Sequence, residues 1–159
     1  MKFIELTQNQ VAIVDDDDFE DLNKYSWSAA CDFKLWYARR AGLTSKHSVI
    51  RMHRQIMGVT NPKIFVDHKN GNSLDNRKEN LRLCSSQQNN RNTRKKSSAS
   101  SIFKGVSWHK GKNKWQANIR YNKILLYLGS FSNETQAALA YNRAAIELFK
   151  EFACINENI

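Results

Sequence analysis

The stretch at residues 67–90, DHKNGNSLDNRKENLRLCSSQQNN, constrains this chain more than any other. Turn-forming Gly, Asn and Asp residues in its first half predict an ordered loop. The apolar run that follows predicts a short strand at 81–83, and either Ser85 or Ser86 suits the N-cap of a helix over 87–93. Because 64–66 reads as a strand, we expect strand, loop, strand and helix in this order.

The polar residues of this stretch match the needs of phosphodiester hydrolysis. His68 can take a proton from water near neutral pH. Asp67 is a hard oxygen ligand suited to Mg²⁺ or Mn²⁺, and Asn89 in the helix can add a neutral oxygen. Asn80, at the turn into the second strand, can fix the loop backbone and orient His68. Neighbouring strand residues point to opposite sides, so the loop beginning at Lys69 must turn the chain for Asp67 and His68 to serve one phosphate.

The charge distribution indicates a polyanionic partner. The chain of 159 residues has a net charge of +10. Residues 77–96 contribute most of it, with seven Lys or Arg against one acidic residue. Such a surplus favours nucleic acid, and an ordinary solvated basic surface is the alternative. A base and a metal ligand within a DNA-binding chain together predict a nuclease.

The cysteines and the apolar runs exclude several classes. Cys31, Cys84 and Cys154 are far apart, and no C-x-x-C motif occurs, which argues against a zinc ribbon or finger. A zinc site of Cys31, His68 and Cys84 stays possible, although no spacing supports it. An odd number of cysteines without a secretory signal favours the cytoplasm of a bacterium or a phage-infected host. No run approaches the roughly 20 apolar residues of a membrane span.

The first third reads as a strand-rich lead-in. Alternation over 3–14 predicts short strands, and the Asp run at 15–18 predicts a solvated turn or helix start, with a metal cluster as the alternative. Paired strands are expected around Trp27 and Trp36. Residues 48–57 should begin as a strand and lead into a short helix closed by Gly58. His53, in this segment, is expected to be a buried structural residue.

Residues 94–101, RKKSSASS, have the composition of a linker, and a second unit follows. Residues 102–131 contain three strand-like segments separated by turns. A helix over 133–149 is predicted, with Asn133 as its N-cap and alanines that let it lie close to the sheet. Residues 115–120 alternate between an apolar face for the helix and a polar, basic face of a size that the DNA major groove can admit.

Residues 67–90 resemble the HNH endonucleases, in particular the phage and intron-associated homing branch. The core pattern D-H-x-x-G-x-x-x-D-N-R-x-x-N-L-R is carried here by Asp67, His68, Gly71, Asp75, Asn76, Arg77, Asn80, Leu81 and Arg82. The upstream MHRQIMG at 52–58 also fits. The resemblance implies that His68 is the general base, Asp67 a metal ligand and Asn80 a loop-bracing residue. The helix ligand falls on Asn89, with Asn90 as the alternative, so a magnesium-type ion is favoured over zinc or nickel.

The second unit resembles the AP2/ERF DNA-binding domain. The resemblance rests on KGVSWHK, KWQANIR, YLGSF, AALAYNRAA and FACIN. It implies that the polar sheet face enters the major groove, although Ser107 stands where the family often has Arg and Leu125 where it has a basic residue. The DNA contacts it implies are Lys104, Ser107, His109, Asn118, Arg120 and Tyr127. Further phosphate contacts are expected from the basic residues Arg77, Arg82, Arg91, Arg94, Lys95 and Lys96.

The expected fold class is α+β. Residues 1–93 should form an HNH nuclease domain with a ββα-metal core at about 63–93, and 94–101 the linker. Residues 102–156 should form an AP2/ERF-like domain with a three-stranded antiparallel sheet packed on one helix. The predicted function is site-specific cleavage of double-stranded DNA with one divalent metal and a His general base, without a membrane or small-molecule partner. The alternatives are a DNA-binding regulator with an inactive nuclease unit and an RNA-directed module.

Overall fold

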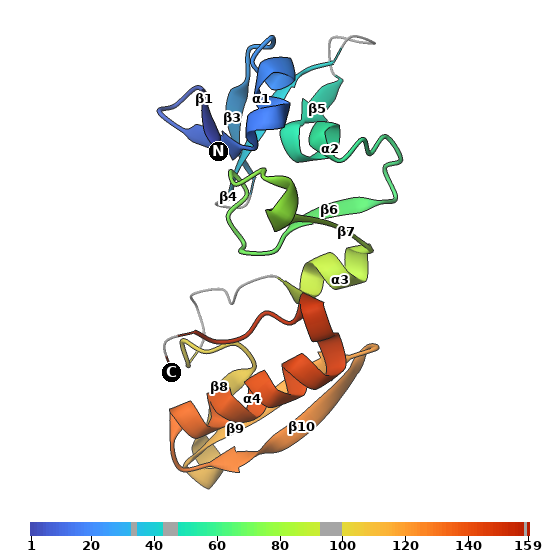
Figure 1. Cartoon of the computed structure of the whole chain (residues 1–159). Helices are drawn as coiled ribbons and strands as arrows, with labels where there is room; N and C mark the ends of the chain where they lie inside the picture. The colour runs from blue at the N-terminus through green and yellow to red at the C-terminus, as the bar shows by residue number, and fades with distance from the viewer. Residues whose placement is uncertain (33–34, 43–47, 93–99, 158) are drawn as a thin grey trace. The chain divides into compact units, whose positions relative to one another are not determined.

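The chain forms two compact units, residues 1–89 and 90–159, in a computed structural model. The structure describes residues 1–32, 35–42, 48–92, 100–157 and 159. Helices alternate with small sheets whose strands all pair antiparallel (Figure 1). This is the expected α+β class. Among the helices in the described ranges, none combines the length and apolar character needed to cross a bilayer.

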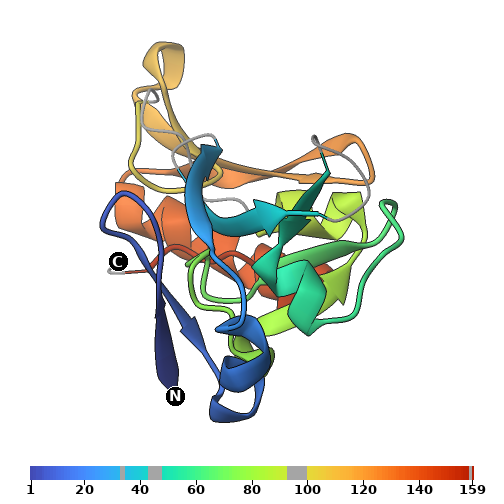
Figure 2. The ribbon, with the colours of Figure 1, turned by 90° about the horizontal axis from the view of Figure 1, so that it is seen from above.

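Unit 1–89 begins with a hairpin and a short helix. β1 (Lys2–Glu5) pairs with β2 (Val11–Val14), and the two strands run side by side in Figure 2. α1 (Asp16–Leu22) starts inside the Asp run, whose carboxylates suit the positive end of a helix dipole. The predicted helix start is therefore confirmed. Within the described residues, no three His, Cys, Asp or Glu side chains lie together in a way that could hold a metal ion.

A three-stranded sheet forms the core of this unit. β3 (Ser28–Asp32), β4 (Leu35–Ala41) and β5 (Val49–Arg51) pair in that order, and α2 (Met52–Ile56) follows directly. Met52 is fully buried in a cluster with apolar residues of β1, β2, α1, β3 and β4. The apolar residues of the lead-in thus hold α2, and with it His53, in a fixed place.

The last part of unit 1–89 has the predicted strand, loop and strand. β6 (Phe65–His68) pairs with β7 (Leu81–Cys84), and a short 3-10 turn, η1 (Lys78–Asn80), precedes β7. α3 (Ser86–Arg91) begins next, one residue earlier than predicted, and position 93 lies outside the described residues. Ser85 is the cap, because its Oγ accepts a hydrogen bond from Gln88 N at 3.3 Å. The boundary between the units falls within α3.

Unit 90–159 is a sheet covered by one helix. β8 (Val106–His109), β9 (Lys114–Tyr121) and β10 (Ile124–Phe131) form a sheet in the order β10-β9-β8, with the 3-10 turn η2 (Lys110–Lys112) between β8 and β9. α4 (Glu134–Phe149) lies along one face of it (Figure 1), and the 3-10 turn η3 (Lys150–Phe152) follows.

The sequence features of α4 explain this packing. Asn133 caps the helix, because its Oδ1 accepts from Thr135 N at 2.7 Å. The alanines at 137, 138 and 145 are fully buried, so the helix backbone can approach the sheet closely. The predicted cap and the predicted contact of the helix with the sheet are both confirmed.

Gly105 lies where the entrance to β8 meets α4. Its φ is +75°, and its oxygen accepts from Asn118 N at 2.8 Å. A Cβ at this position would clash with the ring of Tyr141 and lie 2.7 Å from Asn118 O. Both the left-handed backbone and the close approach therefore require glycine here.

We expect Gly105→Ala to lower the free energy of unfolding of this unit by about 2–4 kcal/mol, since backbone strain and overpacking add. Gly58→Ala is the matched control, because Gly58 also has a positive φ, of 62°, but its Cβ would meet nothing within 4 Å. That control should lose only about 1 kcal/mol. Equilibrium denaturation of both variants tests this, and equal losses would contradict the role assigned to Tyr141.

Candidate functional site

His68 lies at the end of β6, in a setting built from three other segments. It is 6% exposed. The ring of His53 on α2 stands edge-on to it, with centroids 5.1 Å apart, and the ring of Tyr37 on β4 is 6.4 Å away. Its Nε2 lies 3.2 Å from Oδ1 of Asn76, which belongs to the loop between β6 and β7. The ring is therefore held by β4, α2 and that loop together.

The surroundings of His68 favour its neutral form. Burial lowers its pKa, while the hydrogen bond to Asn76 and the charges of Asp67 and Asp75 act in the opposite direction. A general base must be unprotonated before it can accept a proton. The site thus presents a neutral imidazole near neutral pH.

His53 is buried, as the sequence analysis expects, but it is not a distant core residue. Burial lowers its pKa to about 3, and the nearby His68, Arg51 and Arg54 add to the effect. His53 therefore stays neutral beside His68. Its position, like that of Tyr37, follows from the packing of α2 and β4, and no local sequence pattern could have indicated it.

Asn80 joins the two ends of the loop that follows β6. Its Oδ1 accepts from Asn70 N at 3.0 Å, and its Nδ2 donates to Asp75 O at 2.8 Å. Its backbone oxygen also accepts from Lys69 N at 2.8 Å. This geometry suits the loop-bracing role expected for Asn80. The amide that bonds His68, however, is that of Asn76 rather than Asn80.

The loop is also bound to the N-terminal hairpin. Ile13 N in β2 donates to Leu74 O, and Asn76 N donates to Ile13 O, both at 2.8 Å. Lys78 N donates to Oδ2 of Asp15 at 2.7 Å. The strand-rich lead-in thus serves as the support for the loop, a function that its sequence alone does not indicate.

Asp67 and Arg82 are direct cross-strand neighbours in the β6–β7 hairpin. Arg82 donates from Nε at 2.9 Å and from Nη2 at 2.7 Å to Oδ2 of Asp67. The side chain of Asp67 is only 7% exposed, and that of Arg82 only 10%. The carboxylate is therefore held in one orientation by a cationic partner that is itself almost buried.

The side chains proposed as metal ligands supply oxygen donors only. Asp67 offers a carboxylate, and Asn89 on α3 offers an amide oxygen from a half-buried position, whereas Asn90 is exposed. Oxygen donors fit Mg²⁺ or Mn²⁺ better than zinc. The donor set thus fits the predicted type of ion.

Comparison with known proteins places this site in a family. The family described as HNH endonuclease matches residues 55–91, which contain Asp67, His68, Asn80 and Asn89. An uncharacterized HNH endonuclease, L560, of Acanthamoeba polyphaga mimivirus is 35% identical over 146 residues, which are 87% of this chain and 74% of that protein. Protein 3.8 of Escherichia phage T7 is 33% identical over 73 residues, 43% of this chain and 60% of that protein.

The chain belongs to the HNH endonuclease family. The predicted enzyme class, an HNH endonuclease, is thereby confirmed. The family match runs from the end of α2 through β6 and β7 to the end of α3, so it covers the hairpin and the helix described above. The similarity to the mimivirus protein extends well beyond this core, over most of the chain.

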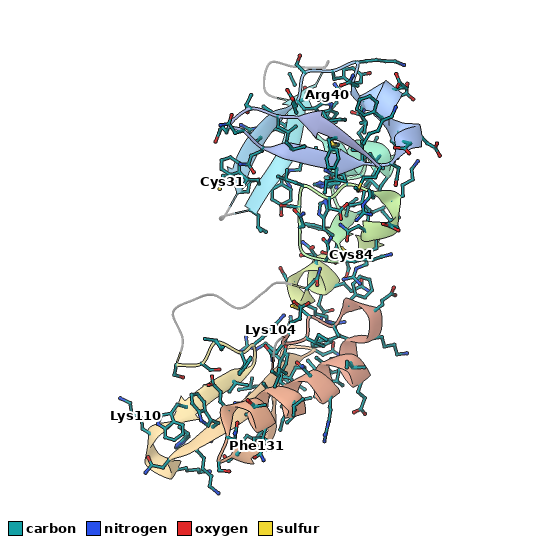
Figure 3. All side chains as sticks on the ribbon, turned by 60° about the vertical axis from the view of Figure 1, so that its left-hand side comes forward. Cys31, Arg40, Cys84, Lys104, Lys110 and Phe131 are labelled. Carbon is teal, nitrogen blue, oxygen red and sulfur yellow. The ribbon has the colours of Figure 1, made fainter. Side chains whose placement is uncertain are left out.

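Several basic residues predicted to contact DNA have partners within this HNH protein. Arg77 is bonded to Asp75 at 2.8 Å and to Glu79 at 2.6 Å. Lys104, labelled in Figure 3, donates from Nζ to Arg91 O at 2.6 Å. The Arg91 guanidinium lies 4.7 Å from the ring centroid of Phe149 and 5.7 Å from that of Tyr121. Arg94, Lys95 and Lys96 lie outside the described residues.

The other predicted DNA-binding residues share the sheet face opposite α4. Cross-strand partners lie on the same face, and the register pairs Ser107 with Gln116, His109 with Lys114, Asn118 with Tyr127 and Arg120 with Leu125. Residues of β9 that alternate with these, Ala117 and Ile119, are buried. The structure therefore brings together the set Ser107, His109, Asn118, Arg120 and Tyr127.

We expect Arg82→Gln to destabilise unit 1–89 by about 3–5 kcal/mol, because it removes the cationic partner of a buried carboxylate. Arg51→Gln is the matched control, since its pair with Asp32 has side chains 47% and 43% exposed. The control should cost under about 1 kcal/mol. Chemical denaturation measures both.

A double variant separates the charge from the packing. With Leu at both Asp67 and Arg82, most of the stability lost in Arg82→Gln should return, because no buried charge is left without its partner. Failure of the double variant to recover stability would mean that Arg82 acts through packing of its side chain and not through its charge.

Proposed function

We propose that this chain is a homing-type DNA endonuclease in which His68 is the general base and Asp67 a metal ligand. The observation that carries the proposal is the juxtaposition of a buried, neutral His68 and a buried carboxylate, Asp67, on β6. Two groups that phosphodiester hydrolysis needs, a proton acceptor and a hard oxygen ligand for a metal ion, are thus available in one hairpin. Membership in the HNH endonuclease family supports DNA as the substrate.

His68 would accept a proton from a water molecule while the water oxygen forms a bond to phosphorus. The bond between phosphorus and the leaving oxygen breaks, and that oxygen takes up a proton from solvent. Asn80 keeps the loop after β6 in shape through Asn70 and Asp75, so His68 stays in place during the step. Correct placement of the base accounts for much of such a rate enhancement.

Asp67 and Asn89 are the residues proposed to hold a divalent ion, with Asn90 as the alternative helix ligand. When bound, the ion neutralises charge on the phosphate and on the leaving oxygen. Mg²⁺ or Mn²⁺ is proposed because the ligands are oxygens. Arg82 keeps the carboxylate of Asp67 oriented on β6. The hairpin and the start of α3 would in this way form a ββα-metal core.

Unit 90–159 is proposed to be an AP2/ERF-like domain that anchors the nuclease to its target. The polar face of its sheet supports this, because it carries Asn118, Arg120 and Tyr127 away from α4. Such a face suits the width of the major groove. Arg94, Lys95 and Lys96, between the units in sequence, are proposed to contact phosphates. We further propose 1–93, 94–101 and 102–156 as nuclease domain, linker and DNA-binding domain.

We expect His68→Ala to reduce cleavage of supercoiled plasmid by at least about 100-fold without weakening DNA binding, since loss of a general base removes 10²–10⁴-fold of rate. EDTA should abolish cleavage by the wild type, and Mg²⁺ or Mn²⁺ should restore it. Arg143→Ala is the matched control, because Arg143 is exposed on α4 of the other unit, opposite the sheet face proposed to contact DNA. At saturating enzyme it should cleave as the wild type does.

Two outcomes would overturn the proposal. Tight DNA binding by the wild type without cleavage under any divalent metal would identify a DNA-binding regulator with an inactive nuclease unit. Equal loss of binding and cleavage in His68→Ala would make His68 a structural or contact residue. Competition with structured RNA would expose an RNA-directed activity.

We expect Arg120→Ala to flatten the dependence of log K on log salt by about 0.9 units, the contribution of one phosphate contact. Arg143→Ala is the matched control, because Arg143 is exposed on α4, which covers the opposite side of the sheet. That control should leave the slope unchanged. Binding to duplex DNA at several salt concentrations measures both slopes, and equal slopes for the two variants would remove the sheet face from the interface.

A further inference from the structure

Asn76 is the most deeply buried polar residue near His68, with 1% of its surface exposed. Its Nδ2 donates to Leu74 O at 3.1 Å, and its Oδ1 lies 3.2 Å from His68 Nε2. A carbonyl oxygen can only accept, so the amide group that faces Leu74 O must be the NH₂. The orientation of the amide follows, with its oxygen directed at the histidine.

The same reasoning fixes the proton on His68. An amide oxygen cannot donate, so the hydrogen bond between Asn76 and His68 requires a proton on Nε2. In a neutral imidazole the other nitrogen, Nδ1, then holds the lone pair. We propose that Asn76 is a positioning residue that selects the Nε2-protonated tautomer of His68 and thereby makes Nδ1 the nitrogen that accepts the proton from water. This rests on the proposed role of His68 as general base.

The backbone around Asn76 holds the amide in place. Asn76 N donates to Ile13 O, and Leu74 O accepts from Ile13 N as well as from the Asn76 side chain. The tautomer of His68 is thus set, through Asn76, by a strand of the N-terminal hairpin. His53 packs edge-on against the same ring and keeps it from turning away from the amide.

The charged groups near His68 act differently from this hydrogen bond. Asp67 and Asp75 act on it through their charge, which favours a protonated ring but does not distinguish its two nitrogens as a hydrogen bond does. Asn80 is committed to Asn70 and Asp75. The bond from Asn76 forms at Nε2, so it distinguishes the two nitrogens of the ring.

The test is a long-range ¹H–¹⁵N correlation spectrum of the ¹⁵N-labelled full-length chain at pH 8, where an ordinary histidine is neutral. His68→Ala assigns the resonances by their disappearance. The wild type should show the pattern of an Nε2-protonated ring. Asn76→Leu removes the acceptor at similar size and should give a mixture of tautomers or the Nδ1-protonated form. Asn76→Asp keeps an acceptor oxygen and should keep the wild-type pattern.

Asn72→Ala is the matched control, because Asn72 is an exposed asparagine of the same loop whose Oδ1 accepts from Leu74 N at 3.1 Å. It should leave the His68 pattern unchanged. In cleavage assays Asn76→Leu should lower kcat about ten-fold or more with KM nearly unchanged, and Asn76→Asp should retain more activity than Asn76→Leu.

An Nδ1-protonated His68 in the wild type would overturn the inference, and so would an unchanged wild-type pattern in folded Asn76→Leu. Should Asn76→Leu fail to fold, the wild-type spectrum still decides which tautomer His68 adopts. The spectra do not depend on nuclease activity. A protein with the expected tautomers that never cleaves DNA would therefore support the role of Asn76 and refute the proposed nuclease function.

Discussion

Two backbone hydrogen bonds between β2 and the loop after β6 hold the candidate site together. They join Ile13 to Leu74 and Asn76, residues about sixty positions apart in sequence. The loop is rich in Asn, Asp and Gly, so apolar packing, to which Leu74 contributes, can hold only part of it. Buried backbone groups must find partners, and β2 supplies them where the loop is most buried. The shape of the loop thus depends on a hairpin that is distant in sequence, at the N-terminal end of the unit.

Further bonds fix the loop from other directions. Ser73 Oγ donates to Trp36 O in β4 at 2.5 Å, and Lys78 pairs through Nζ with Asp18 of α1 at 2.7 Å. Asp15 and Asp18, from the Asp run that resembles a metal cluster in sequence, therefore bind Lys78 at the start of η1. A base that must act within a fraction of an ångström of its ideal position needs such support on several sides.

The sequence predicts local structure well and the neighbourhood of His68 poorly, for a physical reason. The cap at Asn133, the alternation in β9 and the strand, loop and strand around Asp67 depend on neighbouring residues, so a linear pattern records them. His53 and Tyr37 reach His68 only because α2 and β4 pack on one core. No spacing along the chain encodes such a contact.

The role proposed for Asn76 is not evident from the sequence for a related reason. It lies within the family pattern, but a turn-forming asparagine in a loop has an adequate local explanation. Only the direction of its amide, set by Leu74 O, supports the second role proposed for it. Likewise the sequence suggests that Arg77 and Arg82 contact phosphates. Only the structure reveals that Arg77 pairs with Asp75 and that Arg82 pairs with Asp67.

The ion pair of Asp67 and Arg82 is hard to explain by stability alone. Desolvating both groups costs several kcal/mol, and a well-packed apolar pair at the same cross-strand positions would be about as stable or more so. The chain nevertheless places these charges in the middle of a two-stranded hairpin, beside a buried histidine. A carboxylate that is already oriented before any cation arrives is what the metal-binding role proposed for Asp67 requires. The metal-binding role proposed for Asp67 therefore accounts for the pair better than stability does.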